Sequence, residues 1–187
     1  MKKIAVLAVL LAVSFVANAQ KVETNEINEK GVWNIETEFR AFFTEDKMHG
    51  YTLSYAEKKD TKEYLLTFFF MEQHSRWEAK KAEESLLIKT AKNEKVYLQC
   101  LATKSTLAKD RKGINYMTSA IYRVPEENIS LIEDGLVKIR INQVLENGSE
   151  SYFDIELPDD VTVALKKAVK NIKKAIAQGA TIDKSEF

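Results

Sequence analysis

The sequence predicts an α+β protein in which a mainly antiparallel β-sheet packs against a C-terminal amphipathic helix, with one short extra helix. Three observations support this fold class. Residues 64–71 form the densest apolar stretch outside the N-terminal segment. Several runs around it alternate between apolar and polar residues, which is the two-residue period of a half-buried strand. Residues 161–176 instead place apolar residues at the 3.6-residue period of a helix.

We interpret residues 64–71 (Tyr-Leu-Leu-Thr-Phe-Phe-Phe-Met) as a central strand. Successive side chains of a strand point to opposite faces, and here both sets are apolar or nearly so. Both faces should therefore be covered by other elements, because burial of one Phe contributes roughly 1.5–3 kcal/mol. The two sets are Tyr64, Leu66, Phe68 and Phe70, and Leu65, Thr67, Phe69 and Met71.

Two strands are expected before this stretch. Residues 33–43 alternate as one strand with a wet face, and residues 50–56 alternate as its antiparallel hairpin partner. Their aromatic residues belong either to the core, which is the usual role of aromatics on strands, or to the lining of a ligand groove. The apolar sides contain Trp33, Ile35, Phe39, Ala41 and Phe43, and Tyr51, Leu53 and Tyr55.

Several short strands should follow. Residues 72–85 lack a continuous apolar stripe, so we expect a loop or one helical turn there. The charged residues 105–113 should form a solvated loop, and Asn147-Gly148 favours a tight turn between two strands. The expected strands are residues 86–88, 96–103, 114–124, 136–141 and 152–157.

Two helices are expected. Pro125 suits the first position of a short helix, and Gly135 suits its end. The C-terminal helix should be capped by Asp159 or Asp160 and should end at Gly179. Its apolar face, which needs the sheet as a partner, consists of Val161, Leu165, Ala168, Val169, Ile172 and Ile176.

The N-terminal residues have the features of an export signal. Lys2 and Lys3 precede an apolar run, and Ala17-Asn18-Ala19 supplies the small residues that signal peptidase recognises. We expect cleavage before Gln20 and a periplasmic or extracellular location. No transmembrane anchoring is expected, because the apolar run is shorter than the about 20 residues that a membrane-spanning helix needs.

The expected organisation has three parts. Residues 1–19 form the signal peptide, residues 20–31 form a mobile lead-in, and residues 32–187 form a single α+β domain. The chain has 28 basic and 28 acidic residues, and removal of the signal peptide would leave 26 and 28. Nucleic-acid-binding proteins usually show a basic excess, so nucleic acid is not an expected partner.

No motif predicts a catalytic, metal or cofactor site. His49 and His74 lack metal-ligand spacing, and each should be solvated near a strand end. Cys100 lies among apolar residues and should be an inert buried side chain. No Gly-x-Ser-x-Gly motif occurs. The adjacent carboxylates at 83–84, 126–127 and 159–160 should point apart or lie at helix starts, so they do not predict acid–base catalysis.

The C-terminal helix carries a basic face. Lys166, Lys170, Lys173 and Lys174 lie on its polar side with no acidic residue among them. Such a face can bind an anionic membrane or an acidic partner. It can also be an ordinary solvated face, because lysines near a helix C-terminus interact favourably with the helix dipole, by about 0.3–1 kcal/mol each.

Two segments carry a resemblance to other proteins. One joins Tyr122-Arg-Val-Pro-Glu-Glu-Asn-Ile129 to Gly135-Leu-Val-Lys-Ile-Arg-Ile141, and the other joins Leu86-Leu-Ile-Lys89 to Val96-Tyr-Leu98. They resemble segments of small uncharacterised exported proteins of Bacteroidetes-type bacteria. The resemblance implies export and a strand–helix–strand framework, and it brings no catalytic residues.

These features predict an exported, non-enzymatic binding or interaction module for a protein, peptide or small ligand. One alternative is a hydrolase-like enzyme with an unrecognised site, where His74, Trp77 and carboxylates would converge. Another is an envelope-associated protein that makes peripheral membrane contact through the lysine face of its C-terminal helix.

Overall fold

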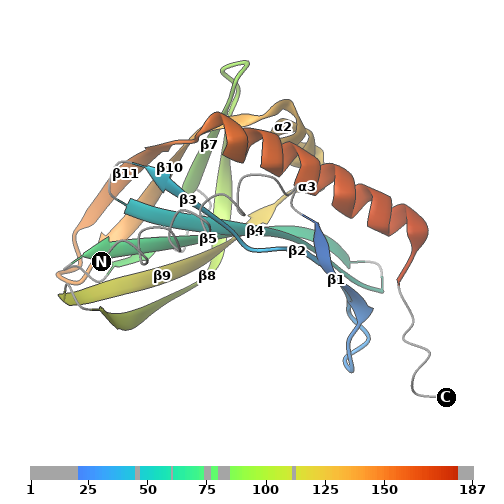
Figure 1. The fold of residues 1–187 in the computed structure, drawn as a ribbon, viewed down its shortest axis with the longest axis horizontal. Helices are drawn as coiled ribbons and strands as arrows, with labels where there is room; N and C mark the ends of the chain where they lie inside the picture. Colours follow the sequence, from blue (N-terminus) through green and yellow to red (C-terminus); the bar gives the residue numbers. More distant parts are fainter. Residues whose placement is uncertain are drawn as a thin grey trace, which may run out of the picture.

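The computed structural model describes residues 21–44, 47–59, 61–73, 77–79, 85–110 and 113–180. The predicted signal peptide, His74 and the carboxylate pair at 83–84 lie outside these residues. Within them, the chain forms an eleven-stranded antiparallel sheet, a short 3-10 helix and two α-helices (Figure 1). The predicted fold class is therefore confirmed.

The described elements follow one another along the chain. The strands are β1 (Val22–Ile27), β2 (Trp33–Thr37), β3 (Arg40–Thr44), β4 (Lys47–Lys58), β5 (Thr61–Gln73), β6 (Trp77–Ala79), β7 (Leu86–Thr90), β8 (Lys95–Asp110), β9 (Gly113–Val124), β10 (Leu136–Leu145) and β11 (Glu150–Glu156). The helices are η1 (Glu126–Asn128), α2 (Ile129–Asp134) and α3 (Asp159–Gln178).

The strand order in the described sheet is β1-β2-β4-β5-β9-β8-β7-β10-β11, while β3 pairs with β4 and β6 pairs with β10. β5 contains the apolar stretch 64–71 and lies inside the sheet, as predicted. β8 changes partner along its length: residues 95–98 pair with β7, and residues 99–110 pair with β9 around an irregularity between Cys100 and Ala102. One strand thus joins the two halves of the sheet.

The sheet bends so strongly that its distant strands meet across the inner face. Phe70 of β5 and Phe153 of β11 have ring centroids 5.6 Å apart, although four strands separate β5 from β11 in the sheet order. Aromatic pairs at this distance and in this edge-to-face geometry are favourable contacts. The buried apolar side chains of the inner face form one core cluster.

The apolar face of α3 covers this interior. Val161, Leu165 and Val169 are buried in the same core cluster as Phe68 and Phe70. α3 contacts β1, β2, β4, β10 and α2, and Figure 1 shows it running along one side of the sheet from α2 to β1. The prediction that the C-terminal helix packs on the sheet is confirmed.

The outer face of β5 is only half-buried, whereas the prediction expected both faces to be covered. Its largest member, Phe69, contacts Phe39 edge-to-face with centroids 5.1 Å apart. Phe39 lies directly over Gly50, where an added Cβ would come within 2.3 Å of its ring. The ring of Phe39 therefore covers Phe69, where a second layer of structure was expected to cover the whole outer face.

The predicted lead-in is wrong for residues 22–27, which form β1 paired with β2. Polar hydrogen bonds hold this strand. Trp33 Nε1 donates to Asn25 Oδ1 at 2.7 Å, and Asn28 Oδ1 accepts from the backbone amides of Lys30 and Val32 at 3.0 and 3.1 Å. A strand held by polar contacts shows no apolar period, which explains why the pattern missed it.

The single strand predicted at residues 33–43 is two strands, β2 and β3. The buried Thr37 hydroxyl bonds the backbone amide and carbonyl of Leu53, at 3.0 Å each. After the break the alternation shifts by one residue, so Phe42 is buried while Phe43 is exposed. The predicted common face of Trp33, Ile35, Phe39 and Phe43 is therefore wrong.

Other predicted connections also contain strands. Residues 105–110 extend β8 and pair with β9, and Ser105 and Thr118 hydroxyls lie 2.6 Å apart across that pair. Residues 77–79 form β6 on β10. At the start of α3, Pro158 holds the capping position without a side-chain cap. Asp160, predicted as a cap, accepts a hydrogen bond from Arg40 at 2.8 Å instead.

Candidate functional site

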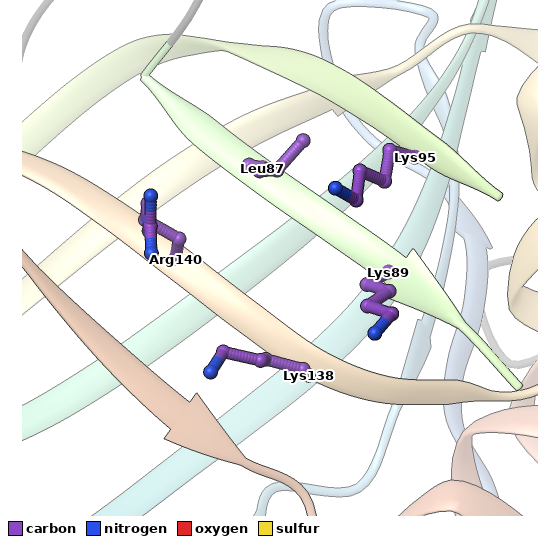
Figure 2. A pocket seen from close by; sticks show the side chains of 5 residues that line it. All are labelled: Leu87, Lys89, Lys95, Lys138 and Arg140. Carbon is purple, nitrogen blue, oxygen red and sulfur yellow. The ribbon is translucent and has the colours of Figure 1, made fainter. Parts of the chain in front are cut away.

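A shallow basic pocket lies on the outer face of β7, β8 and β10. It has a volume of about 210 Å³ and is lined by Leu87, Lys89, Lys95, Lys138 and Arg140. Figure 2 shows these side chains gathered over three neighbouring strands. We call these five residues the basic sheet site.

Strand register brings three lysines together. Lys95 of β8 is opposite Lys89 of β7, and Lys89 is opposite Lys138 of β10. Directly opposed side chains have Cβ atoms about 4.5–5.5 Å apart, and like charges in these positions destabilise a sheet. The alternate residues Ile88 and Ile139 are buried on the inner face, so the strands direct the lysines outward.

The next row of the same face is mixed in character. Leu87 of β7 is opposite Tyr97 of β8 on one side and Arg140 of β10 on the other. Arg140 lies over the Tyr152 ring, with its guanidinium carbon 4.2 Å from the ring centroid. Leu87 and the half-exposed ring of Tyr97 therefore give the basic sheet site an apolar margin.

β11 supplies the acidic side of the site. Asp154 accepts two hydrogen bonds from Arg140, at 2.7 and 3.0 Å. Lys138 Nζ lies 3.0 Å from Asp154 and 2.8 Å from Glu156. The hydrogen bonds from Arg140 foremost, and then those from Lys138, hold the pKa of Asp154 at about 2, against an opposing effect of partial burial. Hydrogen bonds to Glu156 and then to Asp154 raise the pKa of Lys138, and the hydrogen bonds to Asp154 raise the pKa of Arg140.

Lys89 and Lys95 make no ion pair within the described residues. The four cations of the site therefore face two carboxylates, Asp154 and Glu156, which leaves a surplus of two positive charges. The excess positive charge is carried by Lys89 and Lys95, on the β7–β8 side of the site. A site of this kind can hold an anion by charge, with room for an apolar portion at its margin.

The ion pairs of Asp154 predict a pH dependence of stability. Its pKa is 3.8 before folding and about 2 in the folded protein, so the stabilisation is fully present above pH 3.8 and is lost as the pH falls through 2. Because the pairs lie at the surface, we expect a loss of roughly 1 kcal/mol in the free energy of unfolding. Urea unfolding between pH 4 and pH 2 measures it.

Asp154→Asn should remove this part of the pH dependence. Glu146→Gln, in the exposed turn before β11, is the matched control and should leave it unchanged. If the free energy of unfolding changed equally with pH in the two variants, the pH dependence would not come from Asp154.

The lysines predicted on the C-terminal helix do not act as one set. Lys173 Nζ lies 2.6 Å from Glu133 Oε2 of α2. The half-buried Lys166 lies over Gly135, where an added Cβ would come within 2.5 Å of its Cε. Lys170 and Lys174 stay exposed. Lys173 thus pairs with α2, and Lys166 lies against Gly135. The role of the face in binding an anionic partner stays a prediction.

The structure also places the other candidates from the sequence. His49, expected to be solvated, is buried between Phe42 and Phe70, and its Nε2 lies 2.8 Å from the Thr44 hydroxyl. It belongs to the inward side of β4 together with Tyr51. Cys100 is buried, and its thiol donates to the Ala102 carbonyl at 3.3 Å.

The described ranges show neither a metal-binding cluster nor a membrane-spanning helix. These ranges contain no group of three or more His, Cys, Asp or Glu side chains that could hold a metal ion. No helix in those ranges has the length and apolar character needed to span a membrane.

Tyr51, Leu53 and Tyr55, which the sequence offered as a possible groove lining, belong to the buried core.

Sequence reasoning missed the basic sheet site. The alternation predicts a strand at residues 136–141, but it gives no means of setting Lys89 and Lys95 beside Lys138 and Arg140. The missing information is the pairing of β7 with β10, strands far apart in the chain.

Searches against protein-family models, curated proteins and solved structures find no match to this chain. The resemblance to exported bacterial proteins therefore stays a prediction, and the function is argued from the site.

Proposed function

We propose that the protein is an exported, non-enzymatic binding module that holds an anionic ligand in the basic sheet site. The observation that carries the proposal is the row of Lys95, Lys89 and Lys138 on three adjacent strands. Opposed like charges cost a sheet stability. Departures of this kind from local rules are expected at functional sites, and an anion between the lysines would relieve the repulsion.

The chemistry of the lining supports binding rather than bond-making. Four of the five lining residues are Lys or Arg, and the fifth is Leu87. They supply hydrogen-bond donors, positive charge and a small apolar surface. The export part of the proposal is supported by the basic start, apolar run and Ala17-Asn18-Ala19 of the N-terminal sequence.

Lys89→Gln should weaken anion binding without weakening the fold. An exposed charge contact contributes up to about 1 kcal/mol, so we expect roughly a fivefold rise in Kd for citrate or inorganic phosphate at low salt. The free energy of unfolding should stay the same or rise by about 0.2–1 kcal/mol, because repulsion with Lys95 and Lys138 is removed. NMR titration and urea unfolding measure the two quantities.

Lys170→Gln on α3 is the matched control, because Lys170 is an exposed lysine outside the site. It should leave the Kd unchanged. The proposal is overturned if neither anion shifts the amide signals of β7, β8 and β10, or if both variants weaken binding equally.

A further inference from the structure

We infer that the ligand of the basic sheet site is a phosphate monoester whose organic part is apolar or aromatic. The inference rests on the proposed function and names the chemical class of ligand that the same site would select. Three features carry it: the pairing of Arg140 with Asp154, the ammonium groups of Lys89 and Lys95, which make no ion pair among the described residues, and the apolar margin of Leu87 and Tyr97.

The guanidinium of Arg140 is already engaged within the protein. Both of its hydrogen bonds to Asp154 are made, at 2.7 and 3.0 Å, and one of its faces lies on the Tyr152 ring. A planar fork of donors is the group that best matches a carboxylate. Since the Nε–Nη2 fork of Arg140 is already paired within the protein, recognition of the ligand falls mainly to the ammonium groups.

The ammonium groups suit a compact, highly charged anion. Lys89 and Lys95 make no ion pair in the part of the chain that the structure describes, and Lys138 adjoins them on β10. An ammonium group is a point charge with three donors. A phosphate monoester carries about −1.5 to −2 charge and three acceptor oxygens. A phosphate monoester would balance the site's two excess positive charges, whereas a monoanion would balance only one of them.

The organic part of the ligand has a surface to rest on. Leu87 lies beside Lys89 on β7 and opposite Tyr97, whose side chain is 48% exposed. The pocket volume of about 210 Å³ is smaller than the roughly 300–1,000 Å³ of pockets that enclose drug-sized ligands. The site therefore fits a small phosphate ester, or the phosphorylated end of a larger molecule.

The test compares three probes by titration calorimetry on the purified protein: phenyl phosphate, phenyl sulfate and inorganic phosphate. Phenyl sulfate has the same shape as phenyl phosphate but only one negative charge. We expect phenyl phosphate to bind roughly fivefold more tightly than either of the others, since each comparison removes one exposed charge or apolar contact. Leu87→Ser should weaken phenyl phosphate and leave inorganic phosphate unchanged, while Val163→Ser on α3 should change neither.

The outcomes separate the inference from the proposed function. Equal affinity for phenyl sulfate and phenyl phosphate would overturn the phosphate class, and equal affinity for inorganic phosphate would overturn the apolar part. In both cases anion binding would stand. No binding of any probe would overturn both proposals.

A second arm distinguishes the source of the phosphate ester. Phosphatidic acid presents a phosphate monoester at a membrane surface, so cosedimentation with phosphatidic acid vesicles is compared with phosphatidylglycerol vesicles, whose headgroup is a diester. Selective, Lys89-dependent sedimentation with phosphatidic acid indicates a lipid ligand. Phenyl phosphate binding without sedimentation indicates a soluble one.

Discussion

Val169→Asp is expected to unfold most of the protein at room temperature, or to lower its free energy of unfolding by more than about 3 kcal/mol. Val169 is fully buried at the middle of α3. The substitution removes an apolar side chain whose burial contributes roughly 1.5–3 kcal/mol and places a carboxylate without a partner in the core. Circular dichroism during urea unfolding measures the change.

Val163→Asp is the matched control in the same helix, because Val163 is 48% exposed. It should change the free energy of unfolding by no more than about 0.5 kcal/mol. If the two variants were equally stable, α3 would not cover the interior of the sheet.

Phe68→Ala is expected to lower the free energy of unfolding by about 3–5 kcal/mol, the usual cost of such a truncation in a core. Phe68 is fully buried at the centre of β5. Its ring centroid lies 6.3 Å from that of Tyr51, 5.7 Å from that of Phe70 and 6.4 Å from that of Tyr122. A cavity at this position would remove contacts to the neighbouring strands β4 and β9 and to Phe70 of the same strand.

Phe43→Ala provides the comparison, because Phe43 is 67% exposed on β3. Its effect should stay within about 0.5 kcal/mol. Unfolding of both variants by heat in a calorimeter, or by urea, measures the two changes in the free energy of unfolding. A loss at Phe68 as small as that at Phe43 would show that β5 is not the centre of the core.

Much of the fold could be predicted because local patterns and tertiary packing agree. The 3.6-residue period of α3 and the two-residue period of β4 each place the correct residues in the core, as Leu165 and Leu53 show. The pattern failed where polar bonds hold a strand, as Asn25 does in β1. It also failed where a break shifts the alternation, as between Thr37 and Phe42.

The site could not be predicted in the same way. Four lysines at helical spacing were the visible signal, yet Lys173 is paired with Glu133 of α2. Lys89, Lys95 and Lys138 show no pattern in the sequence, because they become neighbours only through pairing of separate strands. Strand order is a property of the whole chain, and the local alternation of each strand does not contain it.

The pairing of β7 with β10 also determines when the basic sheet site can exist during folding. The chain between these strands includes the whole β8–β9 hairpin and α2, and contacts between distant segments form slowly because a long loop must first be closed. We therefore expect the three lysines to come together after the more local β8–β9 hairpin has formed. On the proposed function, an anion would then bind only to molecules in which the pairing of β7 with β10 is complete.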